Sequence, residues 1–179
     1  MELDFKVLSM MDLRSSPGEI LDKVCDQGEA YIIERNGQQK ACLVPISLFF
    51  PDIPKSRLIQ DFNALRESGE NPTLRFSDNK ELEVFLKNEI ANSEVTLKIV
   101  LPHRYPNAAP RVYASPIRAD SPHRWQDGAL CIFGTMTNWN PGKHDLVSAL
   151  NLSRNWLANY SEWCETSKWP AQKEAPNEQ

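Results

Sequence analysis

Four short runs of alternating apolar and polar residues limit what the central part of this chain can fold into. The runs occupy residues 73–76, 82–86, 94–101 and 111–114. Alternation with a period of two is typical of strands that bury one face of a sheet. Because the runs follow one another closely, they favour an antiparallel meander of four strands, and an apolar helical repeat over 56–67 supplies a helix to pack against it. We therefore expect an α+β fold.

Two amphipathic helices frame the predicted sheet. The first has apolar residues at helical spacing, namely Leu58, Ile59, Phe62 and Leu65. The second begins after Asp145, a residue type that favours the N-cap position, and we expect it to run to about Tyr160. The segment 88–92 is expected to connect the second and third strands. Residues 171–179 are polar and contain proline, so we expect a disordered tail.

A segment with two prolines, residues 51–55, is predicted to be a linker, since proline interrupts both helices and strands. It divides the chain into a small domain, residues 1–50, and a larger domain, residues 56–170. The full length of 179 residues is enough for one sizeable core or two smaller ones.

The small domain is predicted to contain a strand, a helix and a β-hairpin. Residues 5–8 are apolar and β-prone, and they form the strand candidate. Ser16, Pro17 and Glu19 have the spacing of a capping box with Ser16 as the N-cap. The Asn-Gly pair at 36–37 lies between two apolar runs and is typical of a two-residue hairpin turn, because both residue types tolerate a positive φ.

Composition and charge disfavour several classes of function. The net charge is −4 and the sequence pI is about 5.4, which argues against non-specific binding to nucleic acid. No apolar run approaches the roughly 20 residues that a membrane span requires. The first residues also lack the pattern of a signal peptide. The four cysteines show no spacing typical of a metal site or of disulfides. We therefore expect a cytoplasmic protein that holds no metal and no other cofactor.

Residues 121–141 carry the clearest candidate for chemistry. Asp127 and Gly128 form a turn signal, and Cys131 follows Gly128 by three residues. A thiol in irregular structure just after a turn can reach a substrate, whereas a thiol inside a strand usually cannot. Cys131 is therefore a candidate nucleophile, and the alternative is a small buried core residue.

This segment resembles the active-site stretch of ubiquitin-conjugating enzymes. Gly128–Cys131 matches the family's Gly-x-(Ile/Leu)-Cys motif, and Trp139–Pro141 matches its Trp-x-Pro motif. Upstream, Tyr105–Val112 is similar to the family's Tyr-Pro-x-x-x-Pro-x-Val segment. The family's His-Pro-Asn tripeptide is replaced by Ser121–His123. The resemblance covers roughly residues 54–170, and it implies a helix, a four-stranded meander, an active-site loop and a C-terminal helix.

The resemblance implies that Cys131 accepts the C-terminus of a ubiquitin-like protein as a thioester and passes it to an amine. His123 stands where the family has asparagine. It would donate a hydrogen bond to the oxyanion or accept a proton from the amine, or it is a structural residue that holds the loop. His144 and Asp145 fall, one position out of register, near the family's acidic residue that orients the attacking lysine. Asp145 could equally be only a helix cap.

The same resemblance implies partners. The sequence has no glycine-rich phosphate loop, so a chain of this kind depends on an activating enzyme for loading. Prokaryotic relatives are often encoded with an activating enzyme, a deconjugating protease or an antiphage nucleotidyltransferase. The expected partners are therefore an activating enzyme and either a ubiquitin-like protein or a nucleotidyltransferase target, in an antiphage conjugation system.

Residues 1–50 are similar to the N-terminal domain of Phd/YefM antitoxins, through segments at 13–16, 19–24, 31–37 and 41–45. That resemblance implies a homodimer and operator DNA binding. Five basic against eight acidic residues in this domain disfavour DNA, because phosphate contacts supply most of the affinity. The sequence leaves three hypotheses open. The chain is a conjugating carrier with a dimerisation domain, or a DNA-binding repressor with an inactive adaptor domain, or a binding module of the conjugating fold.

Overall fold

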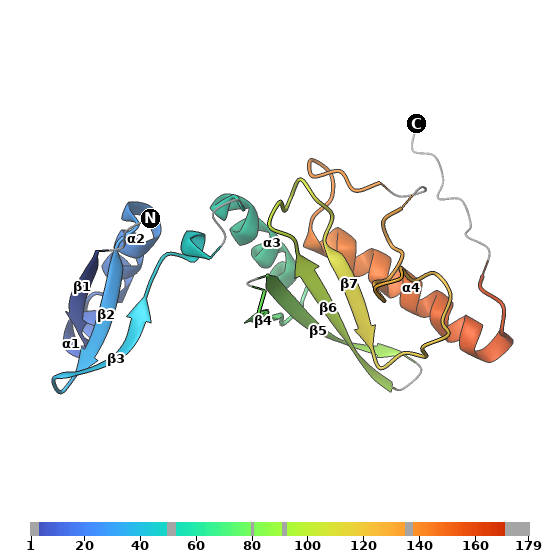
Figure 1. Ribbon diagram of the computed structural model, residues 1–179, viewed down its shortest axis with the longest axis horizontal. Helices are drawn as coiled ribbons and strands as arrows, with labels where there is room; N and C mark the ends of the chain where they lie inside the picture. Colours follow the sequence, from blue (N-terminus) through green and yellow to red (C-terminus); the bar gives the residue numbers. More distant parts are fainter. Residues whose placement is uncertain (1–3, 50–52, 80, 91–92, 135–137, 171–179) are drawn as a thin grey trace. The chain divides into compact units, whose positions relative to one another are not determined.

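The computed structural model describes residues 4–49, 53–79, 81–90, 93–134 and 138–170, and Figure 1 shows the course of the chain. The chain divides into two compact units, Met1–Lys55 and Ser56–Gln179. The predicted tail, 171–179, and the first two residues of the predicted linker lie outside the described residues. None of the helices in the described part of the chain combines the length and the apolar character that crossing a bilayer requires.

The first unit is a three-stranded sheet with two helices. Its elements are β1 (Phe5–Ser9), α1 (Met10–Ser15), α2 (Pro17–Gln27), β2 (Ala30–Arg35), β3 (Gln38–Leu43) and the short 3₁₀ helix η1 (Ile46–Leu48). β2 lies in the middle, parallel to β1 and antiparallel to β3. The buried side chains that form its core are Leu8, Ile20, Val24 and Tyr31, with Leu13 and Leu43 packed against them.

The hairpin turn agrees with the prediction, but the capping box was wrong. Asn36 and Gly37 both have positive φ, at 55° and 71°, as a two-residue hairpin requires. Ser16 makes no side-chain cap. Ser16 is the C-cap of a helix that was not predicted, α1, and it is also the N-cap of α2. Its backbone, with a φ of −139° and a ψ of 55°, forms the junction between the two helices. Glu19 instead pairs with Lys23, one turn further along α2.

The second unit contains the predicted four-stranded meander. Its elements are α3 (Lys55–Glu67), β4 (Thr73–Phe76), β5 (Leu82–Ile90), β6 (Ser93–Leu101), β7 (Arg111–Ser115) and α4 (Leu146–Thr166). The strands lie in the order β4-β5-β6-β7, and every neighbouring pair is antiparallel. The α+β fold expected for this part of the chain is confirmed.

One face of this sheet forms the core of the second unit. Alternate residues of β5 and β6 are buried, namely Leu82, Val84, Leu86, Val95, Leu97, Ile99 and Leu101. The helices contribute a matching set, Leu58, Leu65, Leu146, Ala149, Leu150, Trp156 and Leu157. Figure 1 shows α4 along the sheet, and Arg154 of α4 donates to the Asn88 side chain of β5 at 2.9 Å. The period-two pattern therefore agrees with the burial in β5 and β6, but the half-buried strand predicted at 73–76 was wrong, because every residue of β4 is exposed.

Three details of the second unit differ from the expectation. Residues 88–90 are not a connection, because they continue the ladder opposite Ser93–Val95. Ile59 is 48% exposed and lies off the buried face of α3. α4 continues past Tyr160 to Thr166, because its last turns have a packing partner: the Arg118 guanidinium lies 4.7 Å from the centre of the Trp163 ring.

Candidate active site around Cys131

A tight hairpin places Cys131 beside the end of the sheet. The Trp125 N–H donates to the Ala129 carbonyl at 2.8 Å, and the Gly128 N–H donates back to the Trp125 carbonyl at 2.9 Å. Gly128 has a φ of +87°, and a Cβ there would lie 2.8 Å from the Arg124 guanidinium, so this turn requires glycine. The Leu130 N–H donates to the Val112 carbonyl of β7 at 2.7 Å, which fixes the hairpin to the sheet. Cys131 thus follows directly after an anchored residue.

The thiol of Cys131 is half-buried and lies beside a hollow in the surface. Its Sγ and the half-exposed ring of Trp125 both lie within 4 Å of the point where a side chain at Gly134 would begin. A side chain at position 134 would therefore contact both the sulfur and the indole. The neighbouring hollow has a volume of about 280 Å³ and is lined by Ala109, Pro110, Arg111, Trp125, Ala129, Leu130, Ile132 and Phe133. Its lining is about equally polar and apolar, and it includes the two aromatic side chains of Trp125 and Phe133.

His123 is joined to Cys131 through the backbone. Its carbonyl accepts the Cys131 N–H at 2.9 Å and the indole N–H of Trp156 at 2.8 Å. Its φ of +56° is unusual for a residue other than glycine, although histidine is among the more tolerant types. Its imidazole stacks on the ring of Trp169, with the ring centres 4.7 Å apart. The structure therefore brings these two predicted site residues together.

Asp145 and His144 are both engaged in holding the loop and the start of α4. The Asp145 carboxylate accepts the Ser148 N–H at 2.7 Å, and the Asp145 N–H donates to the Ser148 hydroxyl at 3.3 Å, so the two residues form a capping box at α4. Nδ1 of His144 accepts the Asn140 N–H at 3.0 Å. The His144 ring lies against the ring of Trp139, with the centres 5.7 Å apart. The helix-cap alternative considered for Asp145 is therefore present in the structure.

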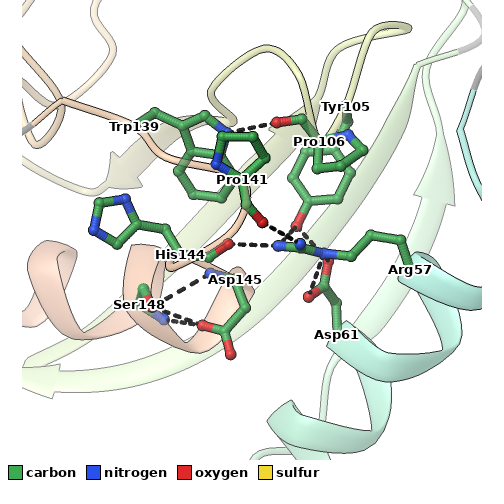
Figure 2. A network of polar contacts seen from close by, with 9 residues as sticks. All are labelled: Arg57, Asp61, Tyr105, Pro106, Trp139, Pro141, His144, Asp145 and Ser148. Atoms are coloured by element: carbon green, nitrogen blue, oxygen red, sulfur yellow. Dashed lines mark hydrogen bonds and ion pairs between the residues drawn. The ribbon is translucent and has the colours of Figure 1, made fainter.

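A buried polar network that sequence reasoning missed holds this loop to α3 (Figure 2). Nε of Arg57 donates to the Asp61 carboxylate at 2.9 Å, and Nη1 donates to the Pro141 carbonyl at 2.7 Å. Nη2 donates to the His144 carbonyl. Figure 2 shows that the backbone of His144, and not its imidazole, faces Arg57. The Tyr105 hydroxyl completes the network by donating to Asp61.

The charges of this network are shielded from water. Asp61 is only 2% exposed and Tyr105 is fully buried. Burial raises the pKa of Asp61, and the hydrogen bonds from Tyr105 and Arg57 oppose that rise. Burial and the bond to Asp61 both raise the pKa of the Tyr105 phenol far above its ordinary value. One signal in the sequence could have revealed the network: Asp61 lies on the apolar face between Leu58 and Leu65, with Arg57 one turn before it.

The loop is also held by an aromatic contact on its other side. The indole N–H of Trp139 donates to the Pro106 carbonyl at 2.6 Å, and the Trp139 ring packs against Tyr105 and Phe133. Segments near 57, 105 and 139–145 thus meet at one place, next to the hairpin of Cys131. In the described ranges, no group of three or more His, Cys, Asp or Glu side chains is arranged to hold a metal ion.

Comparison with known proteins connects this arrangement to a family. No curated protein matches the chain. Among solved structures, the chain is similar to one described as "A complex of the Vps23 UEV with ubiquitin", with 13% identity, a TM-score of 0.43, and coverage of 60% of this chain and 85% of the other. The family match begins at residue 71, so the resemblance of residues 1–50 to Phd/YefM antitoxins stays a prediction.

Residues 71–176 match the family model of the type II CBASS E2 protein, and this range includes the meander, the Cys131 hairpin and α4. The match extends over more than half of the chain. The chain therefore belongs to the type II CBASS E2 proteins, which are ubiquitin-conjugating-like proteins of an antiphage system.

Proposed function

We propose that the chain is a carrier enzyme that holds an acyl group on Cys131 as a thioester. The observation that supports this best is the position of the thiol, half-buried at the end of a rigid hairpin and beside the hollow lined by Trp125 and Phe133. A fixed nucleophile with open access on one side suits an acyl group delivered by another protein. The family match supports a conjugating-enzyme-like role.

In the loading step, the Cys131 thiolate attacks the carbonyl carbon of a thioester held by an activating enzyme. A new S–C bond forms, the bond to the activating enzyme's sulfur breaks, and that sulfur leaves with the electron pair as a thiolate. The acyl group is the C-terminus of a ubiquitin-like protein or a related acyl C-terminus. Because a thioester remains reactive toward amines, the energy of activation is conserved for the second step.

In the transfer step, an amine attacks the thioester carbonyl carbon, and the Cys131 thiolate departs as the C–N bond forms. The oxygen of the tetrahedral intermediate carries negative charge and needs a hydrogen-bond donor. His123 is our candidate for that donor, or for the base that takes the proton from the amine. For His144 and Asp145 we propose a supporting role: their bonds to Asn140 and Ser148 fix the loop and the start of α4.

A thioester trap tests this proposal. The protein is mixed with ATP, a cognate activating enzyme of demonstrated activity and its acyl donor, and the products are separated with and without thiol. We expect an adduct that thiol removes, that is absent in Cys131→Ala, and that persists in Cys164→Ala, since Cys164 is an exposed cysteine outside the site. Cys131→Ser should give an adduct that survives thiol, because an oxyester forms instead.

If the wild-type chain forms no adduct under these conditions, the carrier function is wrong. An adduct that survives in Cys131→Ala would also contradict the assignment, because a different residue would then hold the acyl group. The first result would favour a binding module of the conjugating fold, whereas the second would move the carrier role to another residue.

A further inference from the structure

The C-terminal end of the second unit returns to the loop that carries His123. α4 ends at Ser167, which adopts a left-handed conformation with a φ of +58° and turns the chain away from the helix. Two residues later, the Trp169 ring packs against Trp156 of α4, with the ring centres 5.3 Å apart. The same ring stacks on the imidazole of His123 at 4.7 Å, with an angle of 28° between the ring planes. Trp169 therefore fills the space between α4 and His123.

His123 is held at both its backbone and its side chain by this cluster. The carbonyl is fixed by donors from Cys131 and Trp156, so the position of the backbone relative to the sulfur is set. The remaining freedom of the residue is rotation about its side-chain torsions. An offset stack on an indole restricts that rotation, because the ring planes must stay nearly parallel. Trp169 is thus the contact that fixes the orientation of the imidazole.

We propose that Trp169 is a positioning residue for the transfer step, acting by holding in one orientation the imidazole of His123, the residue whose carbonyl accepts the Cys131 N–H. This assignment rests on the proposed carrier function. It predicts that Trp169 affects the rate of transfer only when residue 123 carries an imidazole ring. A tryptophan that merely stabilised the fold would be needed whether or not that ring is present.

The chain offers a matched control for this test. Trp163 lies one turn before the end of α4, and its ring packs on Tyr160 and on the Arg118 guanidinium. Trp163→Ala therefore removes an indole from the same end of the molecule. His123→Gly removes the imidazole while keeping a residue that adopts a φ of +56° without strain. Trp169→Phe keeps an aromatic face at the stacking position.

The experiment loads Cys131 directly with a short Gly-Gly-terminated peptide, supplied as its mercaptoethanesulfonate thioester, and confirms by mass that Cys131 is the acylated residue. The rate of discharge to free lysine is then measured between pH 6 and 9 in a single turnover. The variants are Trp169→Ala, Trp169→Phe, Trp163→Ala, His123→Gly and the double variant of His123→Gly with Trp169→Ala. The rate of loading is recorded for each protein.

We expect Trp169→Ala to slow discharge about two- to tenfold, the range that an aromatic contact of this kind supports. Loading should be unchanged, and Trp169→Phe should restore most of the rate. In the His123→Gly background, Trp169→Ala should cause no further loss, since coupled residues give non-additive effects. Trp163→Ala should leave discharge close to that of the wild type.

Four outcomes would overturn the assignment while leaving the carrier function intact. Trp169→Ala could discharge at the wild-type rate, it could lose the same factor in both His123 backgrounds, or Trp163→Ala could show the same loss. A wild-type discharge rate for His123→Gly would also exclude it, because Trp169 would then have no catalytic ring to position. If the wild-type chain cannot be acylated on Cys131 at all, the proposed function itself fails, which is a separate result.

Discussion

Tyr105 is the residue on which the segments around the candidate site converge. Its ring is fully buried, its hydroxyl donates to Asp61, and the Arg57 guanidinium lies 5.5 Å from the centre of its ring. Burial and the bond to Asp61 raise the pKa of the phenol above its ordinary value of 10.0. The folded chain therefore keeps this proton at alkaline pH, where the unfolded chain releases it.

The raised pKa of Tyr105 predicts a specific loss of stability at alkaline pH. Above pH 10 the unfolded state loses a proton that the folded state retains, so the free energy of unfolding should fall by up to about 1.4 kcal/mol per pH unit from this residue alone. Tyr105→Phe lacks this proton. It should be less stable than the wild type at pH 7 by about 1–3 kcal/mol, because Asp61 loses a donor.

Urea unfolding followed by tryptophan fluorescence measures this difference, because all five tryptophans lie in the second unit. The gap between the wild type and Tyr105→Phe should narrow as the pH rises from 9 to 11. Contributions from other tyrosines cancel in the comparison. A gap that stays constant over this range would show that the phenol titrates normally in the folded chain.

Among the regular elements, α3 shows how far a sequence pattern can predict a site. The helix and its buried residues Leu58 and Leu65 follow from apolar spacing, which is a local property. The role of Asp61 does not, because a carboxylate is buried only when distant groups supply its hydrogen bonds. One of those groups, Tyr105, lies 44 positions away along the chain. The prediction also placed Ile59 on the buried face of α3, where the structure shows it exposed. Hydrophobicity alone does not determine which residues of a helix face inward.

The Cys131 hairpin depends on local sequence, whereas the Trp169 contact depends on residues that are distant in the sequence. The turn at Gly128 and the place of Cys131 just after it were predictable, because a positive φ and a short hydrogen-bonded loop are encoded within a few residues. The stack of Trp169 on His123 joins residues that are far apart in the sequence. Which partners the tryptophans around α4 find depends on how the completed fold places them.

The network that joins α3 to the loop predicts a large effect from removing Arg57. Arg57→Met leaves the buried Asp61 carboxylate without its cation, and it removes the donors to the Pro141 and His144 carbonyls. We expect the free energy of unfolding of the second unit to fall by about 3–5 kcal/mol. Arg66→Met, which changes an exposed arginine of the same helix, should change it by no more than about 0.5 kcal/mol.

Denaturation followed by tryptophan fluorescence gives these values. Adding Asp61→Leu to Arg57→Met should recover much of the loss, since the uncompensated charge is then absent. Equal effects of Arg57→Met and Arg66→Met would mean that the network contributes little, and that the loop is held by the bond from Trp139 to Pro106 instead.

At the scale of the whole molecule, the two units have separate cores. The core cluster of the first lies within residues 8–43, and the core of the second lies within residues 58–157, with the buried Ile53 between these two ranges in the sequence. The candidate site draws its described residues from the second unit alone. The predicted roles of the first unit, dimerisation and the less favoured binding of DNA, can therefore be tested apart from the chemistry at Cys131.

A chain truncated to residues 51–179 should retain the chemistry and lose the predicted dimer. Because the second unit keeps its complete core, we expect its tryptophan unfolding curve to match that of the full-length chain, and Cys131 to be acylated by the same peptide thioester at the same rate. Sedimentation should show a monomer for the truncated chain and a dimer for the full-length chain. If the truncated chain unfolds without a cooperative transition, the second unit depends on the first for its stability. If both chains sediment as monomers, residues 1–50 do not dimerise, and the predicted dimer is wrong.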